Sequence, residues 1–228
     1  GLAEDIRDAY TWLDHAPVMM DLHHARAMGV YFQDAQCSLY PMLNNIVFDL
    51  CYNHSPEDLQ FVMFAPSISG IRRRQEYVRQ FKQLPHFNGL IRDQSQFVFD
   101  RRYAEEVMDR LYHLYTLREA DPKAAPRCHI ILLFLEDYGL RYHRLASLLP
   151  LSAAEIESED NSLSFLFFTH HENELPPYCS HVLKMDASRN LFYIPYVRQF
   201  SPADQEDKNC YGVLPDAFAS CLRIPGAS

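Results

Sequence analysis

Four short apolar runs punctuate the chain, and each has the length of a buried β-strand. They occupy residues 29–32, 59–64, 130–135 and 163–168. The runs are nearly continuous in their apolar character, which is typical of strands that are covered on both faces of a parallel sheet. We therefore expect these four runs to be neighbours in one parallel sheet.

Apolar residues recur at helical spacing between the runs. Leu43, Ile46, Val47 and Leu50 share one face of a helix that the turn at residues 53–56 would end. Further helices are expected at about 2–14, 71–83, 102–118 and 142–149, and further strands at 18–22, 97–99, 181–185 and 191–197, the last two paired around a turn. Alternating strands and helices predict an α/β fold in three layers, with a mostly parallel sheet and helices on both faces. Residues 1–228 are expected to form a single domain.

Composition narrows the function classes. The chain has 228 residues, 48% of them hydrophobic, and a formal net charge of −9, so a nucleic-acid partner is not expected. The six cysteines lack CxxC spacing and fit reduced thiols of a cytosolic protein. No apolar run reaches the roughly 18 residues of a transmembrane helix. Because the chain starts with Gly1 rather than methionine, we expect it to be a piece of a longer protein.

Two segments have distinctive motifs, the turn NHSPEDL at residues 53–59 and LPHFNG at residues 84–89. They resemble the motifs N-x-S-P-E-x-[VL] and L-P-H-x-x-G of the FtsK/SpoIIIE-type ATPases, in particular those of type VII secretion (the EssC/EccC family). A looser likeness is found at residues 23–29. The resemblance covers about residues 15–200 and implies a P-loop-NTPase-like fold. Counting back from the NHSPEDL turn without a gap, the family's phosphate loop falls on residues 33–40.

The residues at these loop positions do not suit phosphate. A working loop needs glycines that let backbone N–H groups converge, a lysine for the terminal phosphates and a hydroxyl for Mg²⁺. By the resemblance, three of the glycines are replaced by Gln33, Gln36 and Ser38. Leu39 replaces the lysine, and Tyr40 replaces the hydroxyl residue. We therefore expect a P-loop-like fold without a working P-loop, and no bound cofactor. The N-terminus of the following helix could still attract an anion weakly.

An acidic pair follows the apolar run at 130–135. In P-loop ATPases this place holds the carboxylates that bind Mg²⁺ and polarise water. Glu136 and Asp137 fall there, with the alignment open by one residue. Without the lysine and the hydroxyl they have no nucleotide to act on, so we interpret them as vestigial. Acidic residues at the end of a strand are also ordinary solvated caps.

Histidine chemistry offers a competing hypothesis, a metal-dependent hydrolase. The doublets are His23-His24 and His170-His171, the second followed by Glu172 and Glu174. Adjacent side chains in a strand point to opposite faces, and neither HExxH nor CxxC accompanies them. Neither G-x-S-x-G nor a marked nucleophilic cysteine occurs. We therefore expect no metal site and no catalytic residue.

The resemblance implies a function that the residues do not state by themselves. It is closest to the degenerate ATPase-like domain that precedes the first true ATPase domain of EssC/EccC proteins. We expect a non-catalytic pseudo-ATPase module that links the membrane region to the motor and contributes to protein export. Its partners would be the adjacent ATPase domain of the same parent chain and other secretion components, at the cytoplasmic face of the bacterial membrane. The isolated chain would be monomeric or weakly associating; whether the full-length protein is a homo-oligomer stays open, as does a nucleotide-sensing or weakly active ATPase.

Overall fold

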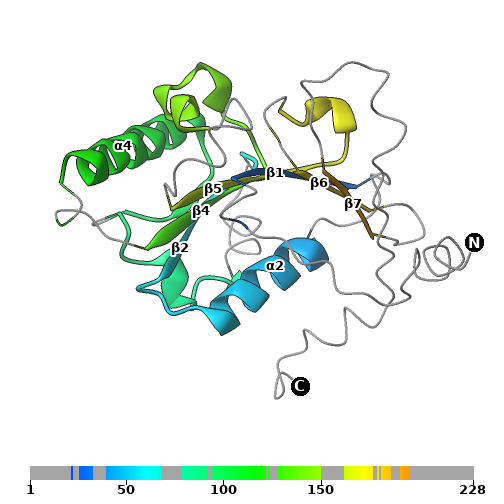
Figure 1. Ribbon diagram of the computed structural model, residues 1–228, viewed down its shortest axis with the longest axis horizontal. Coiled ribbons are helices and arrows are strands. Elements are labelled where there is room, and N and C mark those ends of the chain that lie inside the picture. Colours follow the sequence, from blue (N-terminus) through cyan, green and yellow to red (C-terminus); the bar gives the residue numbers. More distant parts are fainter. Residues whose placement is uncertain are drawn as a thin grey trace, which may run out of the picture.

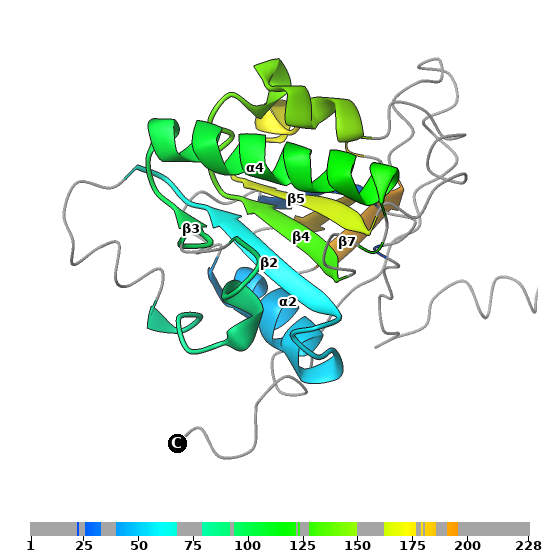
Figure 2. The same cartoon turned by 90° about the vertical axis from the view of Figure 1, so that its left-hand side faces the viewer.

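The described strands form one seven-stranded sheet at the centre of the computed structural model. The structure describes residues 22, 26–32, 40–67, 79–91, 94–121, 123, 128–149, 162–176, 179, 181–185 and 191–195. The strands are β1 (Ala27–Phe32), β2 (Leu59–Phe64), β3 (Phe97–Val98), β4 (His129–Phe134), β5 (Leu163–Thr169), β6 (His181–Met185) and β7 (Leu191–Pro195). Their order across the sheet is β3-β2-β4-β5-β1-β6-β7 (Figures 1 and 2).

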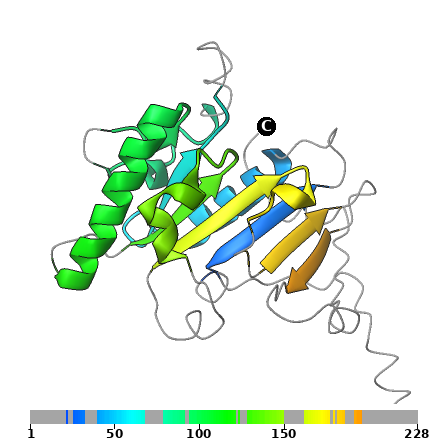
Figure 3. The same cartoon turned by 90° about the horizontal axis from the view of Figure 1, so that it is seen from above.

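Six of the strands run in one direction. β1 pairs in parallel with both β5 and β6, and β2 pairs in parallel with β3 and β4. β4 and β5 are also parallel, whereas β7 runs antiparallel to β6 (Figure 3). The expectation that the four apolar runs are neighbours is confirmed, because β2, β4, β5 and β1 are consecutive in the sheet. The predicted pairing of the last two strands is also confirmed.

Helices cover both faces of this sheet. Helix α2 (Tyr40–Asn53) lies on one face and helix α4 (Arg101–Ala120) on the other (Figures 1 and 2). Asp100 caps α4, since its carboxylate accepts a hydrogen bond from the backbone N–H of Tyr103 at 2.9 Å. The predicted three-layer α/β architecture is therefore confirmed.

The two layers explain the unbroken apolar runs. In β4, Ile130, Leu132 and Phe134 belong to the core beneath α4. The intervening Ile131 and Leu133 belong to the core beneath α2. Because both faces are covered, a strand in the middle of the sheet has no position for a solvated side chain.

The helix predicted at 142–149 is present in part, as 3₁₀ rather than α-helical turns. The segment forms two 3₁₀ turns, η2 (Leu140–Tyr142) and η3 (Arg144–Leu148). His143 separates them in an extended conformation, with φ −93° and ψ 146°. Its Nδ1 accepts a hydrogen bond from the backbone N–H of Leu145 at 3.1 Å, so the His143 side chain caps the N-terminus of η3.

Several expected elements lie outside the described residues. These are the helix at 2–14, all but the last residue of the strand at 18–22, most of the helix at 71–83, and the chain after residue 195. Among the helices that the structure describes, none combines the length and the apolar character needed to cross a bilayer.

Candidate functional site

The place that the resemblance gives to the phosphate loop lies between β1 and α2. Gln33, Gln36, Ser38 and Leu39 fall outside the described residues. Tyr40 is the first residue of α2, and its half-buried ring packs against the apolar core on the α2 face. The residue aligned with the Mg²⁺-holding hydroxyl therefore contributes to packing.

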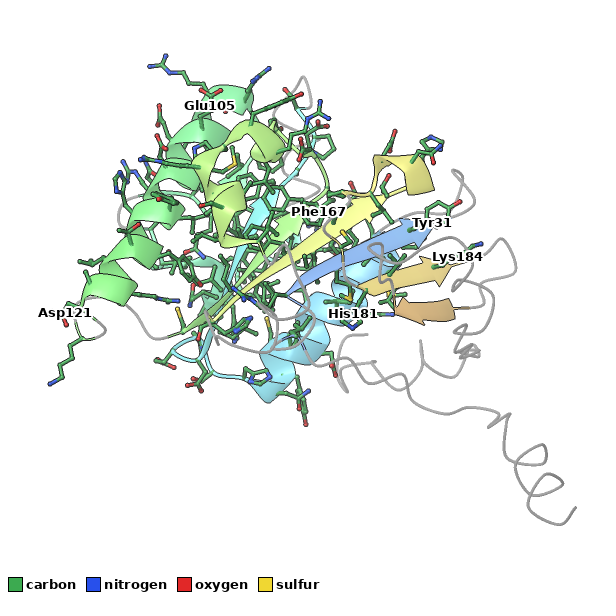
Figure 4. The ribbon with its side chains drawn as sticks, turned by 45° about the horizontal axis from the view of Figure 1, so that its top comes forward. Tyr31, Glu105, Asp121, Phe167, His181 and Lys184 are labelled. Atoms are coloured by element: carbon green, nitrogen blue, oxygen red, sulfur yellow. The ribbon has the colours of Figure 1, made fainter. Side chains whose placement is uncertain are left out.

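A lysine from another strand lies near the end of β1. Lys184 of β6 pairs in register with Tyr31 of β1, and its Nζ lies 6.0 Å from the centroid of the Tyr31 ring. Figure 4 shows both side chains at the same end of the sheet. Tyr31 packs against the core on the α4 face, opposite α2. Lys184 thus does not take the place at the start of α2 that a P-loop lysine occupies.

The acidic pair lies just beyond the end of β4, with β5 between that strand and β1. The backbone N–H groups of Leu135 and Glu136 both donate to the carbonyl of Phe64, at 2.8 and 3.2 Å. Oδ2 of Asp137 accepts a hydrogen bond from the N–H of Gly139 at 3.1 Å. The Glu136 carboxylate accepts none from the described residues. Asp137 therefore shapes a turn, while Glu136 faces solvent.

This turn contains two residues with positive φ. Tyr138 has φ +50° and Gly139 has φ +83°. For tyrosine this conformation is uncommon and persists where surrounding contacts hold it. Here the Tyr138 hydroxyl donates a hydrogen bond to the carbonyl of Ala65, immediately after β2. The loop after β4 is therefore tied to the neighbouring strand.

A pocket of about 530 Å³ opens beside this loop. Its charged lining comes from Arg101 at the start of α4 and from the loop after β4; the lining residues are Pro66, Ser67, Arg101, Glu136, Asp137, Tyr138, Gly139, Arg141 and Tyr142. Two arginines and two carboxylates make its formal charge zero. The carboxyl ends of parallel strands are where open α/β sheets usually bind ligands, so this pocket is a candidate site distinct from the phosphate-loop position.

The loop is fastened to α4 at its far end. Nε2 of His143 lies 3.0 Å from Oδ1 of Asp109 and carries the proton, because Nδ1 already accepts the Leu145 N–H. Arg144 donates to the same oxygen, with Nη2 at 2.8 Å. Burial raises the pKa of Asp109, but the hydrogen bonds from Arg144 and His143 and the charge of Arg144 outweigh this effect, and the pKa lies below its usual value.

The two segments that carry the resemblance contact each other. Nε2 of His86, in LPHFNG, lies 2.9 Å from the carbonyl oxygen of His54, in NHSPEDL. A carbonyl only accepts, so Nε2 carries the proton and donates. The ring of Phe87 stacks on Phe61 of β2 with centroids 5.1 Å apart. These segments therefore hold the end of α2 against β2, which is a structural role.

Gln96 completes this connection. It is fully buried, and its Nε2 donates to the carbonyl of Phe61 at 2.7 Å, while its Oε1 accepts the N–H of Leu90 at 3.0 Å. Its own carbonyl accepts the N–H of Met63 at 2.8 Å. The side chain thereby extends the short β3 ladder along β2 by one hydrogen bond.

The described residues give little support to a metal site built on histidines. His170 is half-buried beside Phe32, with ring centroids 6.2 Å apart, and Thr169 donates to Oε2 of Glu174 at 2.7 Å. His23 and His24 lie outside the described residues. In the part of the chain that the structure describes, no three histidine, cysteine, aspartate or glutamate side chains come close enough to share a metal ion.

Cys51 and Cys128 are poorly suited to nucleophilic chemistry. Cys128 and Cys179 are buried and Cys51 is half-buried. Burial raises the pKa of Cys51 to about 12. Burial also raises the pKa of Cys128, although Arg118 opposes the shift. A thiol held in its protonated form is a weak nucleophile.

Sequence reasoning missed Gln96, Arg101 and Arg141. A glutamine between apolar segments gives no periodic signal, and the two arginines meet only through the fold. The pair Arg141-Tyr142 beside the acidic pair was the one available hint, because arginine and tyrosine are frequent in contact surfaces.

No known protein family matches the chain, and no curated protein matches it.

Proposed function

We propose that this chain is a non-catalytic, ATPase-like module of a type VII secretion motor. One observation carries the proposal, namely a strand and a helix joined by a connection whose residues lack phosphate-binding chemistry. β1 leads into α2, as in a strand–phosphate loop–helix unit, while the intervening positions carry Gln33, Gln36 and Leu39 in place of glycines and lysine. Tyr40 adds a packed ring where a small hydroxyl would be needed.

The acidic pair supports the same proposal. Asp137 uses one carboxylate oxygen to form a turn, and a carboxylate committed to the backbone is a poorer Mg²⁺ ligand. Glu136 alone would offer Mg²⁺ a single carboxylate. Nucleotide phosphates usually supply further ligands to Mg²⁺, but here no lysine is present to bind them.

The likeness in LPHFNG and NHSPEDL is compatible with a protein that binds no nucleotide. The two segments are hydrogen-bonded to each other through His86 and His54. Gln96 attaches LPHFNG to β2, because its Nε2 donates to the carbonyl oxygens of His86 and Phe61. Their work is to fix the end of α2, so their presence does not require an active site.

The module would then act through its contacts. We place it at the cytoplasmic face of the bacterial membrane, between the membrane region and the motor domains of a longer parent chain. Its partners would be the adjacent ATPase domain and other secretion components. It would contribute to the export of small helical WXG100-type proteins without hydrolysing ATP itself. The net charge of −9 argues against nucleic acid as a partner.

The full-length parent tests this proposal. The double variant Glu136→Gln with Asp137→Asn preserves shape and the turn, since asparagine can still accept the Gly139 N–H. We expect ATP hydrolysis by the parent to stay within about twofold, while deletion of this module stops export. The equivalent acid-to-amide change in a true ATPase domain is the matched control and should abolish hydrolysis. A loss of about tenfold or more in the double variant, equal to about 1.4 kcal/mol at the transition state, would show that this domain is catalytic.

A further inference from the structure

The loop after β4 presents an arginine and a tyrosine to solvent as a stacked pair. Tyr142 is 79% exposed, and the guanidinium carbon of Arg141 lies 4.5 Å from the centroid of its ring. Arg141 donates no hydrogen bond to any described residue, so its N–H groups are available. Exposed tyrosine and arginine side chains are the types that most often dominate contact energy in protein interfaces.

Hydrogen bonds hold this loop at both ends. At its start the Tyr138 hydroxyl donates to the Ala65 carbonyl, after β2. At its end His143 and Arg144 donate to the Asp109 carboxylate on α4, at 3.0 and 2.8 Å. A contact through Arg141 and Tyr142 would therefore order little additional chain, which removes one of the main costs of association.

Charge makes the surface self-complementary. Glu136, whose carboxylate accepts no hydrogen bond from the described residues, lines the same pocket as Arg141. The pocket carries two positive and two negative side chains, on a chain with a net charge of −9. Self-repulsion between two copies is therefore smaller at this neutral surface than the net charge of the whole chain would suggest.

We propose that Arg101, Glu136, Arg141 and Tyr142 form a patch through which two copies of this chain associate about a two-fold axis. In such an interface the same patch of both copies is used, so a contact from one residue of the first copy to another residue of the second copy occurs twice. Arg141 of each copy faces Glu136 of the other, and the two Tyr142 rings lie near the axis. The patch is small and its ion pairs are exposed, so the dissociation constant is on the order of 10⁻⁴ M. This inference is independent of the secretion role.

Charge reversal tests the pairing directly. Sedimentation equilibrium of the whole chain, from about 10 µM to 1 mM, should show a monomer–dimer equilibrium in this range. Arg141→Glu and Glu136→Arg should each weaken dimerisation by about tenfold or more, because each change acts twice in a symmetric dimer. A tenfold loss is about 1.4 kcal/mol, shared between two ion pairs. The double variant with both reversals should restore the dissociation constant to within about threefold, since the pairs re-form with opposite polarity.

Another exposed tyrosine among the described residues provides a matched control. Tyr142→Ser should weaken dimerisation, whereas Tyr52→Ser, at an 85% exposed position on α2, should not. Unfolding midpoints of all variants establish that each is folded. A wild-type chain that stays monomeric at 1 mM would overturn the proposal, as would single reversals without effect or a double reversal without rescue. Protection of the same patch by the neighbouring domain in a longer chain, with no dimer of this one, would assign the surface to that domain instead.

Discussion

Replacement of Gln96 by leucine should destabilise the protein strongly, although the two side chains are similar in size. Gln96 is fully buried, and its amide satisfies the carbonyl of Phe61 and the N–H of Leu90, at 2.7 and 3.0 Å. Leucine would leave both backbone groups without these hydrogen bonds, at a site where Phe61 is fully buried and Leu90 is 8% exposed. The hydrogen bond from Met63 to the Gln96 carbonyl is unaffected.

The size of the effect follows from the two orphaned backbone groups, and Oε1 of the buried Gln60, 3.2 Å from Nε2 of Gln96, loses a donor as well. A buried donor or acceptor without a partner costs about 1–3 kcal/mol. Two of them give about 2–6 kcal/mol, and we expect a loss near 4 kcal/mol in the free energy of unfolding. A domain of this size is usually stable by only about 5–15 kcal/mol, so the variant should be close to unfolding.

Urea unfolding followed by circular dichroism measures this loss. Gln83→Leu is the matched control, because Gln83 is exposed and the same change should stay within about 0.5 kcal/mol there. Gln96→Glu keeps an acceptor for Leu90 but loses the donor to Phe61 and buries a carboxylate, so it should be at least as damaging. A loss below about 1 kcal/mol in Gln96→Leu, with an unchanged urea dependence, would refute the structural role given to this residue.

Three further predictions concern other parts of the chain. Gly29→Ala should cost no more than about 1 kcal/mol in urea unfolding, because its Cβ would lie 2.7 Å from Cδ2 of Leu175, the end of a flexible side chain that can shift; a loss above about 3 kcal/mol would show that Leu175 is held in place. Asp109 has a depressed pKa when folded, so its contribution is present above the unfolded value near 4 and disappears as the pH falls through the folded value; the stability difference between wild type and Asp109→Asn should therefore shrink in acid, and a constant difference would contradict it. Leu39→Lys restores one charge in a loop that still lacks its glycines and hydroxyl, so calorimetry should find Mg-ATP binding no tighter than about 1 mM; recovered binding would show that the loop shape had survived.

The layers and the central strands could be predicted from sequence for a physical reason. β4 and β5 are covered on both faces, so nearly every position is apolar and the runs are unmistakable. The boundaries of β2, Leu59–Phe64, agree with the predicted run because a proline-containing turn precedes it. Strand order also follows in part, since long apolar strands favour the middle of a sheet.

Interactions between distant residues could not be predicted in the same way. Gln96 bonds to Phe61, 35 residues away, and His86 bonds to His54, 32 residues away. Neither contact leaves a periodic pattern. The segment at 142–149 has apolar residues at helical spacing, yet His143 caps η3 and breaks the run. The pocket forms only when Arg101 and the loop after β4 come together at one edge of the sheet.

Isothermal titration calorimetry of the wild-type chain with Mg-ATP tests the central claim most directly. The claim is that the strand-to-helix connection between β1 and α2 has lost the groups that grip phosphate, so that the module acts without nucleotide. A working P-loop ATPase under the same conditions serves as the positive control. The account predicts no binding tighter than about 1 mM, equivalent to about 4 kcal/mol. Micromolar binding of Mg-ATP would contradict it and would make the chain a nucleotide-binding domain with an unusual site.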